Sequence, residues 1–401
     1  MKNVSSSNGL EKRPKLRFPG FDEPYKQCRI GDIYAERSQR GAADMELLSV
    51  TMNDGVMPRS EIEGKDNSSE DKSNYKVVRT GDMVYNSMRM WQGANGISPC
   101  DGIVSPAYTV LMPKNPISNG YFAALFKSPN LINEFRKNSQ GMTSDTWNLK
   151  YPQIETIKVC IPALTEQERI ADMLGTLEKR IAKQAQLIES LKKYKRGVIR
   201  ELLTPELCKL KEVTWTTAKI GELGKFIKGA PLSKADISSQ GAPFILYGEL
   251  YTTYNEVITS VVRKTKAGVD EVYHSKIGDV IIPTSGETPE EISTASCVML
   301  NDVILAGDLN IFRSKNIDGR ILSYILNHIV NTEIARVAQG KSVVHVQASE
   351  ISKISINYPD TETQKKMVNM FERISSKVSY AEKQLYTLIE LRKRLLQQLF
   401  I

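Results

Sequence analysis

The feature that most constrains this chain is a long amphipathic segment that occurs twice. "IPALTEQERIADML" begins the first copy near the middle of the 401 residues, and "NYPDTETQKKMVNMF" begins the second copy near the C-terminus. The copies align without gaps for about forty residues, with Gln167 matching Gln364 and Pro162 matching Pro359. The sequence therefore predicts an internal repeat with a long helix at the end of each half.

Apolar residues follow an alternating spacing of three and four along both copies, which is typical of a coiled-coil seam. A basic residue interrupts both seams at the same place, as Lys195 and Arg392. The interpretation that the two helices pack on separate cores stays open. The predicted seam residues are Leu174, Leu177, Ile181, Ile188, Leu191, Val198 and Leu202 in the first copy, and Phe371, Ile374, Val378, Leu385, Leu388, Leu395 and Leu399 in the second.

Signals at the helix ends set the expected boundaries. Thr165 and Thr361 are predicted N-caps, because each is followed three residues later by a capping-box partner, Glu168 or Gln364. Thr204-Pro205 is expected to end the first helix, because proline restricts the residue before it and lacks a backbone N–H.

The repeat continues upstream of each helix, with loops of different length. Each half has a Gly-Asp turn before a β-rich run, as in "RTGDMVYNS" and "KIGDVIIPT". An apolar strand ("AYTVLM", "DLNIFR"), a helical stretch ("GYFAALFKSPNLINEFRK", "RILSYILNHIVNTEIARV") and a Gly-containing loop follow. A short strand ("ETIKVCIP", "SKISINYP") then leads into the long helix. Two domains of one topology would produce this pattern.

Size, charge and apolar content bound the class of protein. A length of 401 residues favours two or more domains. No apolar run reaches the roughly 18 residues of a membrane span, and the first residues lack a signal peptide, so we expect a cytoplasmic protein with no membrane partner. The five scattered cysteines indicate neither disulfides nor a zinc site. The net charge of +8 suggests a polyanionic partner, but the two helical segments carry +7 of it.

The sequence contains no recognisable catalytic motif. Gly340-Lys341-Ser342 ends like a phosphate-binding loop, but Ala335 occupies the position of its first glycine. The tetrapeptide that would hold a target amino group beside S-adenosylmethionine is absent, and so is GxGxxG. His274, His328 and His345 have no metal-ligand spacing. We therefore expect no catalytic residue, metal or cofactor in this chain.

The layout resembles the specificity (S) subunit of Type I restriction-modification systems over essentially the whole chain. "PKLRFPGF", the stretch from "GDMVYNSMRMWQGANGIS" to "DGIVSPAYTV", and "IPALTEQERIADML" carry the resemblance, although Tyr25 stands where such domains commonly have tryptophan, as Trp215 does. The resemblance implies recognition of double-stranded DNA in two half-sites. It also implies two modification subunits that use S-adenosylmethionine to methylate adenine, and restriction subunits that use ATP and Mg²⁺.

The expected fold class is α+β, with two mixed α/β target-recognition domains separated by two long antiparallel coiled-coil helices in an internal two-fold pseudo-repeat. Antiparallel pairing follows because the second helix must return along the first. A coiled-coil protein-interaction adaptor and a self-sufficient DNA methyltransferase of unfamiliar type remain alternatives. The predicted ranges are 1–163 for the first domain, 164–204 for the central spacer helix, 205–359 for the second domain and 360–401 for the C-terminal spacer helix.

Candidate DNA contacts lie in four loops. Arginine can bond guanine, and asparagine or glutamine can bond adenine, through two hydrogen bonds. The alternative for "YNSMRMWQGANG" is that Met90 and Trp91 are core and the polar residues satisfy the loop backbone. The candidates are Asn86, Arg89, Trp91 and Gln92 in that loop, Thr143 and Ser144 in "SQGMTSD", Lys341, Ser342 and His345 in "AQGKSVVHVQ", and Arg59 in "NDGVMPRS".

Overall fold

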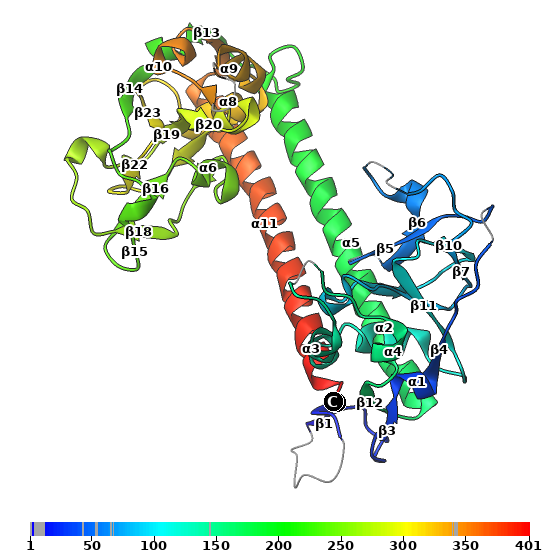
Figure 1. Ribbon diagram of the computed structural model, residues 1–401. Helices are drawn as coiled ribbons and strands as arrows, with labels where there is room; N and C mark the ends of the chain where they lie inside the picture. The colour runs from blue at the N-terminus through cyan, green and yellow to red at the C-terminus, as the bar shows by residue number, and fades with distance from the viewer. Residues whose placement is uncertain are drawn as a thin grey trace. The chain divides into compact units, whose positions relative to one another are not determined.

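The computed structural model describes residues 2–3, 13–41, 44–52, 55–64, 66, 68–143, 146–338, 340 and 344–401. The chain forms two compact units, the first from Met1–Ala185 and Lys383–Ile401 and the second from Gln186–Glu382. Each unit holds one mixed α/β domain and part of two long helices. These helices are α5 (Leu164–Leu203) and α11 (Thr361–Gln398), coloured green and orange to red in Figure 1.

The two long helices pair antiparallel within each unit. In the first unit, Glu178 pairs with Arg392 at 3.0 Å, and the Gln184 amide donates to Gln384 at 3.3 Å. Residue numbers rise along α5 while they fall along α11, which defines the antiparallel direction. The second unit adds an ion pair of 2.9 Å between Lys192 and Glu382.

Burial along the helices follows the predicted seam. Half of the seam residues are at most 9% exposed, namely Leu174, Leu177, Ile188, Phe371, Ile374, Val378 and Leu399. The others are half-buried, namely Ile181, Leu191, Val198, Leu202, Leu385, Leu388 and Leu395. The prediction of two long helices with an apolar seam is therefore confirmed.

The predicted N-caps are wrong, because α5 begins at Leu164 and α11 at Thr361, which places the N-caps at Ala163 and Asp360. At α5 the carbonyl of Ala163 accepts from the N–H groups of Glu166 and Gln167, both at 3.0 Å. At α11 the Asp360 carboxylate accepts from the Thr363 N–H at 3.0 Å. A carboxylate both satisfies this donor and complements the positive end of the helix dipole. Thr165 and Thr361 thus lie inside the helices, whereas α5 ends before Thr204-Pro205 as predicted.

The first domain is built on a four-stranded antiparallel sheet in the order β4-β11-β8-β9. Its strands are β4 (Tyr34–Glu36), β11 (Tyr108–Pro113), β8 (Met83–Asn86) and β9 (Asn95–Ile97). Short pairs surround it: β1 (Lys2–Asn3) with β2 (Leu16–Arg17), β5 (Leu48–Thr51) with β6 (Gly55–Pro58), and β7 (Lys76–Val78) with β10 (Gly102–Val104). The helices are α1 (Ile30–Ile33), α2 (Asn119–Leu125), α3 (Pro129–Asn138) and α4 (Tyr151–Ile154), with the 3-10 turns η1 (Arg59–Glu61) and η2 (Met90–Gln92).

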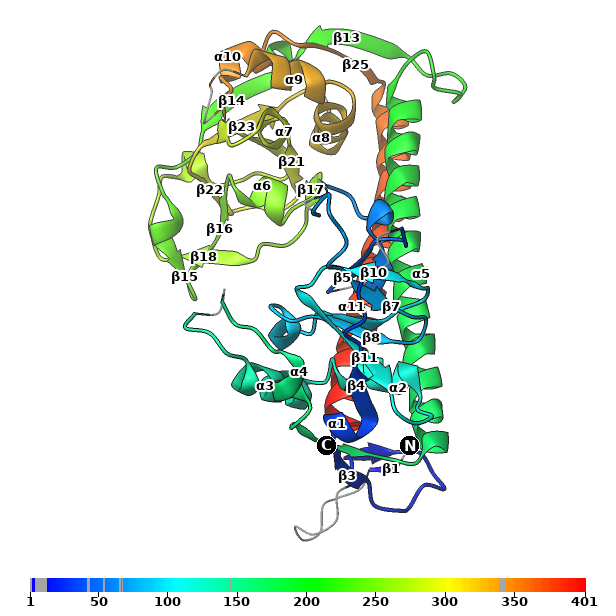
Figure 2. The ribbon, with the colours of Figure 1, turned by 45° about the vertical axis from the view of Figure 1, so that its right-hand side comes forward.

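The second domain repeats this sheet and extends it. Its five-stranded sheet has the order β14-β23-β19-β21-β17, in which β17 adds a parallel edge strand. The α8 helix packs against β21 and β19 of this sheet (Figure 2). The strands are β14 (Gly224–Lys228), β23 (Leu309–Ser314), β19 (Asp279–Pro283), β21 (Ser296–Val298) and β17 (Val257–Ile258).

Further elements of the second domain lie outside this sheet. A second sheet has the order β15-β18-β16-β22, from β15 (Ile237–Ser238), β18 (Arg263–Thr265), β16 (Ala242–Leu246) and β22 (Ile304–Ala306). The helices are α6 (Glu249–Thr252), α7 (Pro289–Ile292), α8 (Gly319–His328), α9 (Asn331–Val337) and α10 (Ala348–Ile351), with 3-10 turns η3 (Ile220–Glu222), η4 (Lys234–Asp236) and η5 (Glu271–Tyr273). The stretch that the sequence predicts to be helical forms two helices in each domain, α2 and α3 in the first and α8 and α9 in the second.

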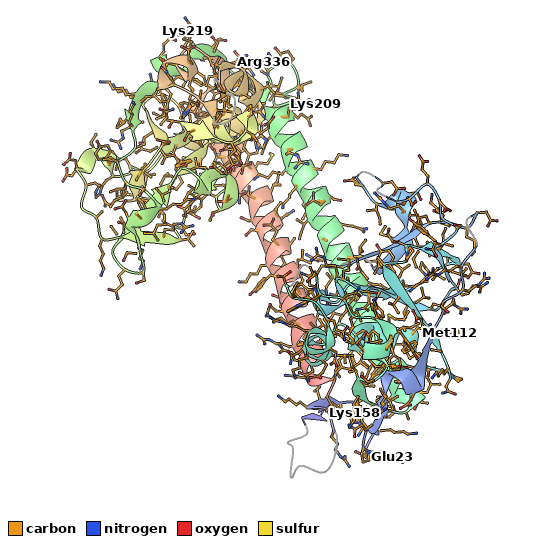
Figure 3. The ribbon with its side chains drawn as sticks, in the orientation of Figure 1. Glu23, Met112, Lys158, Lys209, Lys219 and Arg336 are labelled. Atoms are coloured by element: carbon orange, nitrogen blue, oxygen red, sulfur yellow. The ribbon has the colours of Figure 1, made fainter. Side chains whose placement is uncertain are left out.

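A two-stranded ribbon leads into each long helix. In the first unit β3 (Lys26–Arg29) pairs with β12 (Lys158–Ile161), and Figure 3 shows Glu23 and Lys158 at this ribbon. In the second unit β13 (Trp215–Lys219) pairs with β25 (Ser355–Pro359), where Figure 3 labels Lys219. Each ribbon joins an early strand of a domain to its last strand, so it closes the domain at the start of the helix.

Each unit has an equivalent glutamine that makes the same two hydrogen bonds. The Gln167 side chain donates to the carbonyl of Pro162 at 3.0 Å and accepts from the Ser118 N–H at 3.2 Å, just before α2. The Gln364 side chain donates to the carbonyl of Pro359 at 2.8 Å and accepts from the Asp318 N–H at 2.9 Å, just before α8. Each glutamine thus ties the end of a ribbon and the start of a domain helix to a long helix.

The Gly-Asp turns are also repeated in their bonding. Gly81 and Gly278 have φ values of +90° and +94°, which glycine adopts without strain. The following carboxylates are buried and bonded to an arginine, with closest distances of 2.7 Å for Arg37 to Asp82 and 2.7 Å for Arg313 to Asp279. Arg37 directly follows β4 whereas Arg313 lies in β23, so the pairing itself is what the two domains share.

We predict that Ile188→Asp lowers the free energy of unfolding by about 2–5 kcal/mol, because it places an unpaired charge in the buried seam. Ile188 is 4% exposed. Its neighbour Leu187 is 46% exposed, so Leu187→Asp is a matched control expected to stay within about 0.5 kcal/mol of the unaltered chain. Thermal or urea unfolding of both variants provides the measurement. Equal stability of the two variants would argue against a packed helix pair.

Candidate nucleic-acid interface

In the first domain, the structure brings together two of the predicted loops. Loop A (residues 86–93) follows β8, and loop B (residues 139–149) joins α3 to α4. The N–H of Leu149 donates to the carbonyl of Ser87 at 2.8 Å, which joins the end of loop B to the start of loop A. Asn86, Arg89, Trp91 and Gln92 therefore lie in a loop adjoining the one that holds Thr143. Ser144 lies outside the described residues.

Two tryptophans pack where these loops meet. The Trp91 and Trp147 rings lie edge to face with centroids 5.2 Å apart, and the guanidinium of Arg136 lies 5.4 Å from the Trp147 ring. The Trp91 indole N–H donates to the carbonyl of Met88 at 3.1 Å. Trp91 is therefore a half-buried link between the loops, while Met90 is fully buried as the core interpretation expects.

The polar candidates of loop A differ in whether their side chains are already bonded. The Asn86 amide oxygen accepts from the Met88 N–H at 3.0 Å and stabilises the turn. The side chains of Arg89 and Gln92 make no hydrogen bond or ion pair within the described part of the chain, and Arg89 is exposed. These two groups can therefore bond a ligand without breaking a bond of the protein.

Loop B has a closed base and a polar tip. Gln140 and Asn148 exchange backbone hydrogen bonds of 3.0 and 2.8 Å. Inside the loop, the N–H of Thr143 donates to the hydroxyl of Thr146 at 3.1 Å, and Thr143 is exposed. The exposed tip can present hydroxyl groups to a phosphate or a base.

Arg59 lies apart from this pair of loops, in η1. Its guanidinium donates to the carbonyls of Ile62 and Gly64 at 2.6 and 3.1 Å, and lies 3.7 Å from the Asp66 carboxylate. Arg59 stays a prediction, and it would have to give up these bonds to reach a base.

The second domain has a corresponding pair of loops. Loop C (residues 284–293) follows β19, and loop D (residues 338–347) precedes α10. The N–H of Val346 donates to the carbonyl of Thr284 at 3.0 Å, and both residues lie 197 positions after the bonded pair of the first domain. His345 is exposed in β24 (Val344–His345), which pairs with β20 (Ser285–Gly286). Lys341 and Ser342 lie outside the described residues.

Loop C carries acidic groups where loop A carries Arg89. Glu287 and Glu290 are exposed and unpaired within the described residues, and Thr288 caps the short α7 by accepting from the Glu291 N–H. A carboxylate can accept a hydrogen bond from the amino group of cytosine. Arg336 at the end of α9 is also exposed (Figure 3).

Sequence reasoning missed Trp147, Arg136 and the carboxylates of loop C. Trp147 is half-buried, and it could have been found from its own loop, because a tryptophan in a polar loop beside a glycine is a binding signal. Acidic pairs are common on any surface, so the sequence offers no comparable signal for Glu287 and Glu290.

No group of three His, Cys, Asp or Glu side chains in the described ranges could hold a metal ion. The described part of the chain also has no helix with the length of apolar sequence that a bilayer requires.

The fold and the loops define a protein with two similar α/β domains, each with its own pair of exposed polar loops, on a shared pair of helices. The family model described as Type I restriction modification DNA specificity domain matches the chain twice, over residues 23–193 and 212–391. The chain belongs to this family of Type I restriction-modification specificity subunits.

Relatives and solved structures agree with the family. The Type I restriction enzyme MjaVIII specificity subunit of Methanocaldococcus jannaschii is 22% identical over 336 residues, covering 77% of each chain. The putative MjaX specificity subunit of the same organism is 21% identical over 361 residues, covering 84% of this chain and 81% of that one.

Two solved structures share the fold. The Type I S subunit from M. genitalium has a TM-score of 0.59 at 14% identity and covers 97% of this chain and 99% of its own. A chain from a structure of complex assembly and conformational transition in a type I R-M system has a TM-score of 0.60 at 16% identity, covering 95% and 98%.

We predict that Arg89→Ala relaxes base discrimination in one half of the target by about 1–3 kcal/mol, because a bidentate contact to a base edge would be lost. The measurement is the methylation rate, with the partner subunits present, on DNAs that differ at single base pairs. Lys137→Ala is the matched control, since it removes the same charge from α3, where Lys137 pairs with Glu134 at 2.7 Å. Uniform weakening on every DNA would instead make Arg89 a phosphate contact.

Proposed function

We propose that the chain recognises a bipartite, asymmetric DNA target, one half by each domain, and directs adenine methylation or restriction by partner subunits to it. Loops A and B would contact one half of the target, and loops C and D the other. The number of base pairs between the halves is called the gap below.

One observation carries the proposal. The same backbone hydrogen bond joins the loop pair in both domains at a constant shift of 197 residues. The exposed side chains that these bonds hold are different, with Arg89 in loop A and Glu287 and Glu290 in loop C. A constant frame with different polar groups is what two domains need in order to recognise two different sequences.

The chain is proposed to be non-catalytic and to bind no cofactor itself. S-adenosylmethionine, ATP and Mg²⁺ would be bound by two modification subunits and by restriction subunits. Affinity for DNA would then come largely from the assembled complex, because Lys and Arg contacts to phosphate dominate binding and most of the net charge of this chain lies on its helices.

Exposed apolar side chains on the long helices support a protein partner. In the second unit, Tyr194 of α5 and Tyr380 of α11 are 60% and 65% exposed. In the first unit, Tyr386 and Ile389 of α11 are 67% and 42% exposed. Tyrosine is enriched in protein interfaces, so we assign these surfaces to the modification subunits.

We predict that exchanging the first domain for that of a related specificity subunit changes one half of the methylated sequence and leaves the other half intact. The exchange should end at Asp172, because Arg17 forms a bidentate, buried ion pair with Glu166, and Gln167 bonds Ser118. Methylation mapping of cellular DNA provides the measurement. A chimera that changed both halves together would contradict independent recognition.

We predict that Tyr386→Glu reduces co-purification of the modification subunit at least tenfold, because a charge would be buried in the interface. Lys393→Glu, on the same helix and exposed, is the control for the added negative charge. Retention of the partner by both variants would place its binding surface elsewhere.

A further inference from the structure

The two basic residues that interrupt the helix seams have different partners. Arg392 pairs with Glu178 of α5, so its bond stays within the helix pair. The ammonium group of Lys195 instead lies 2.7 Å from the carboxylate of Glu256, directly before β17 of the second domain. Equivalent positions of the repeat therefore have different roles, and Lys195 connects a helix to a domain.

Both carboxylate oxygens of Glu256 and its backbone carbonyl have hydrogen-bond partners. Its second carboxylate oxygen accepts from Nε2 of His328, the last residue of α8, at 2.8 Å. Its carbonyl accepts from the N–H of Cys297 in β21 at 2.8 Å and from the hydroxyl of Ser323 in α8 at 2.6 Å. The backbone of Glu256 is thus fixed to the domain while its carboxylate reaches α5.

The side chains of Lys195, Glu256 and His328, called the ion cluster below, are only 13–16% exposed. Tyr324 stacks on the His328 ring, lies 5.9 Å from the Lys195 ammonium and packs against Phe371 of α11. Burial disfavours the charged form of Glu256, but the hydrogen bond from His328 and the charge of Lys195 outweigh it and lower the Glu256 pKa to about 2. The Glu256 carboxylate is therefore charged and mostly buried, and it is sensitive to the loss of a partner. The cluster lines one side of a cleft.

The cluster provides a second attachment of the domain to α5. The first is apolar, because Ile199 and Leu203 belong to the core of the second domain. Beside Lys195 there is a cleft of about 750 Å³ in place of apolar packing. The cleft is lined by α5, α11, α8 and residues 253–260. Lys195 is four residues, or about 6 Å, along the helix from Ile199. The domain is also joined to α11, through Met367 and Phe371 in its core, so the cluster adds a contact that restrains the angle of the domain on α5.

The first domain has no such cluster among its described residues. When Ser118 is aligned with Asp318, which bond equivalent glutamines, Ala124 and Ser128 occupy the positions of Tyr324 and His328. The start of α5 and the end of α11 are instead joined to this domain by apolar residues and by the buried ion pair of Arg17 with Glu166. Among the described residues, a three-membered cluster of this kind thus occurs in the second domain and has no counterpart in the first.

We propose that Lys195, Glu256 and His328 are positioning residues that fix the orientation of the second target-recognition domain on α5, and thereby the gap that the complex accepts. This inference rests on the proposed function. Among the described residues, the cluster makes no hydrogen bond or ion pair with loops A to D, so we expect it to leave the preferred bases of both halves unchanged.

The test measures gap discrimination by the complex of the full chain with its modification subunits. DNAs would carry the native half-sites at the native gap, or with one base pair added or removed. Lys195→Met should lower the preference for the native gap about tenfold while the preferred bases stay unchanged. Lys192→Met is the matched control, because it removes the same charge one turn earlier from a much more exposed pair with Glu382. It should retain the native preference.

Two further variants separate positioning from stability. Lys195→Met combined with Glu256→Gln leaves no unpaired buried charge, so it should recover thermal stability without recovering gap discrimination. Lys195→Arg, which can still pair with Glu256, should retain gap discrimination. The proposal is overturned if Lys195→Met keeps the native preference, if Lys192→Met loses as much, or if the double variant recovers both properties. Failure of the unaltered complex to methylate any specific site would contradict the proposed function instead.

Discussion

Each domain core of this protein is completed by the start of one long helix and the end of the other, and the rest of the structure depends on this shared burial. Ile170 and Leu174 of α5 lie in the core of the first domain together with Leu399. Met367 and Phe371 of α11 lie in the core of the second domain together with Ile199 and Leu203. Because each core requires opposite ends of the two helices, the helices must run antiparallel. Neither domain can bury its core without both helices.

The repeat is conserved in hydrogen bonds more than in residue types. Gln167 and Gln364 make the same two bonds, the Gly-Asp carboxylates each hold an arginine, and one backbone bond joins each pair of loops. The sheets share their first four strands, while the second domain adds a parallel strand and a second sheet. A frame fixed by such bonds allows the residues of the loops it supports to vary without disturbing the fold.

The two domains differ most in the charge of their loops and in their attachment to the helices. Loop A presents an unbonded arginine, and loop C presents unbonded carboxylates. The attachment of the first domain is apolar, with the exception of the buried pair of Arg17 and Glu166, whereas the second adds the ion cluster of Lys195. An ion pair is directional, so each of these pairs restricts the orientation of its domain on α5 in a way that apolar packing does not.

The sequence by itself determined the two long helices, their seam and the repeat of one topology, because periodic apolar residues and matched motifs are local patterns. It placed Asn86, Arg89 and Gln92 in a loop, but it did not show which of their side chains are hydrogen-bonded within the protein. It also gave no sign that Asp360 caps α11 or that Lys195 bonds Glu256. The cap depends on the backbone angles at the start of α11, and the Lys195 bond joins residues 61 positions apart that meet in space. Only the tertiary structure decided them, because burial and geometry, rather than residue type, determine whether a polar group is bonded within the protein or available to a partner.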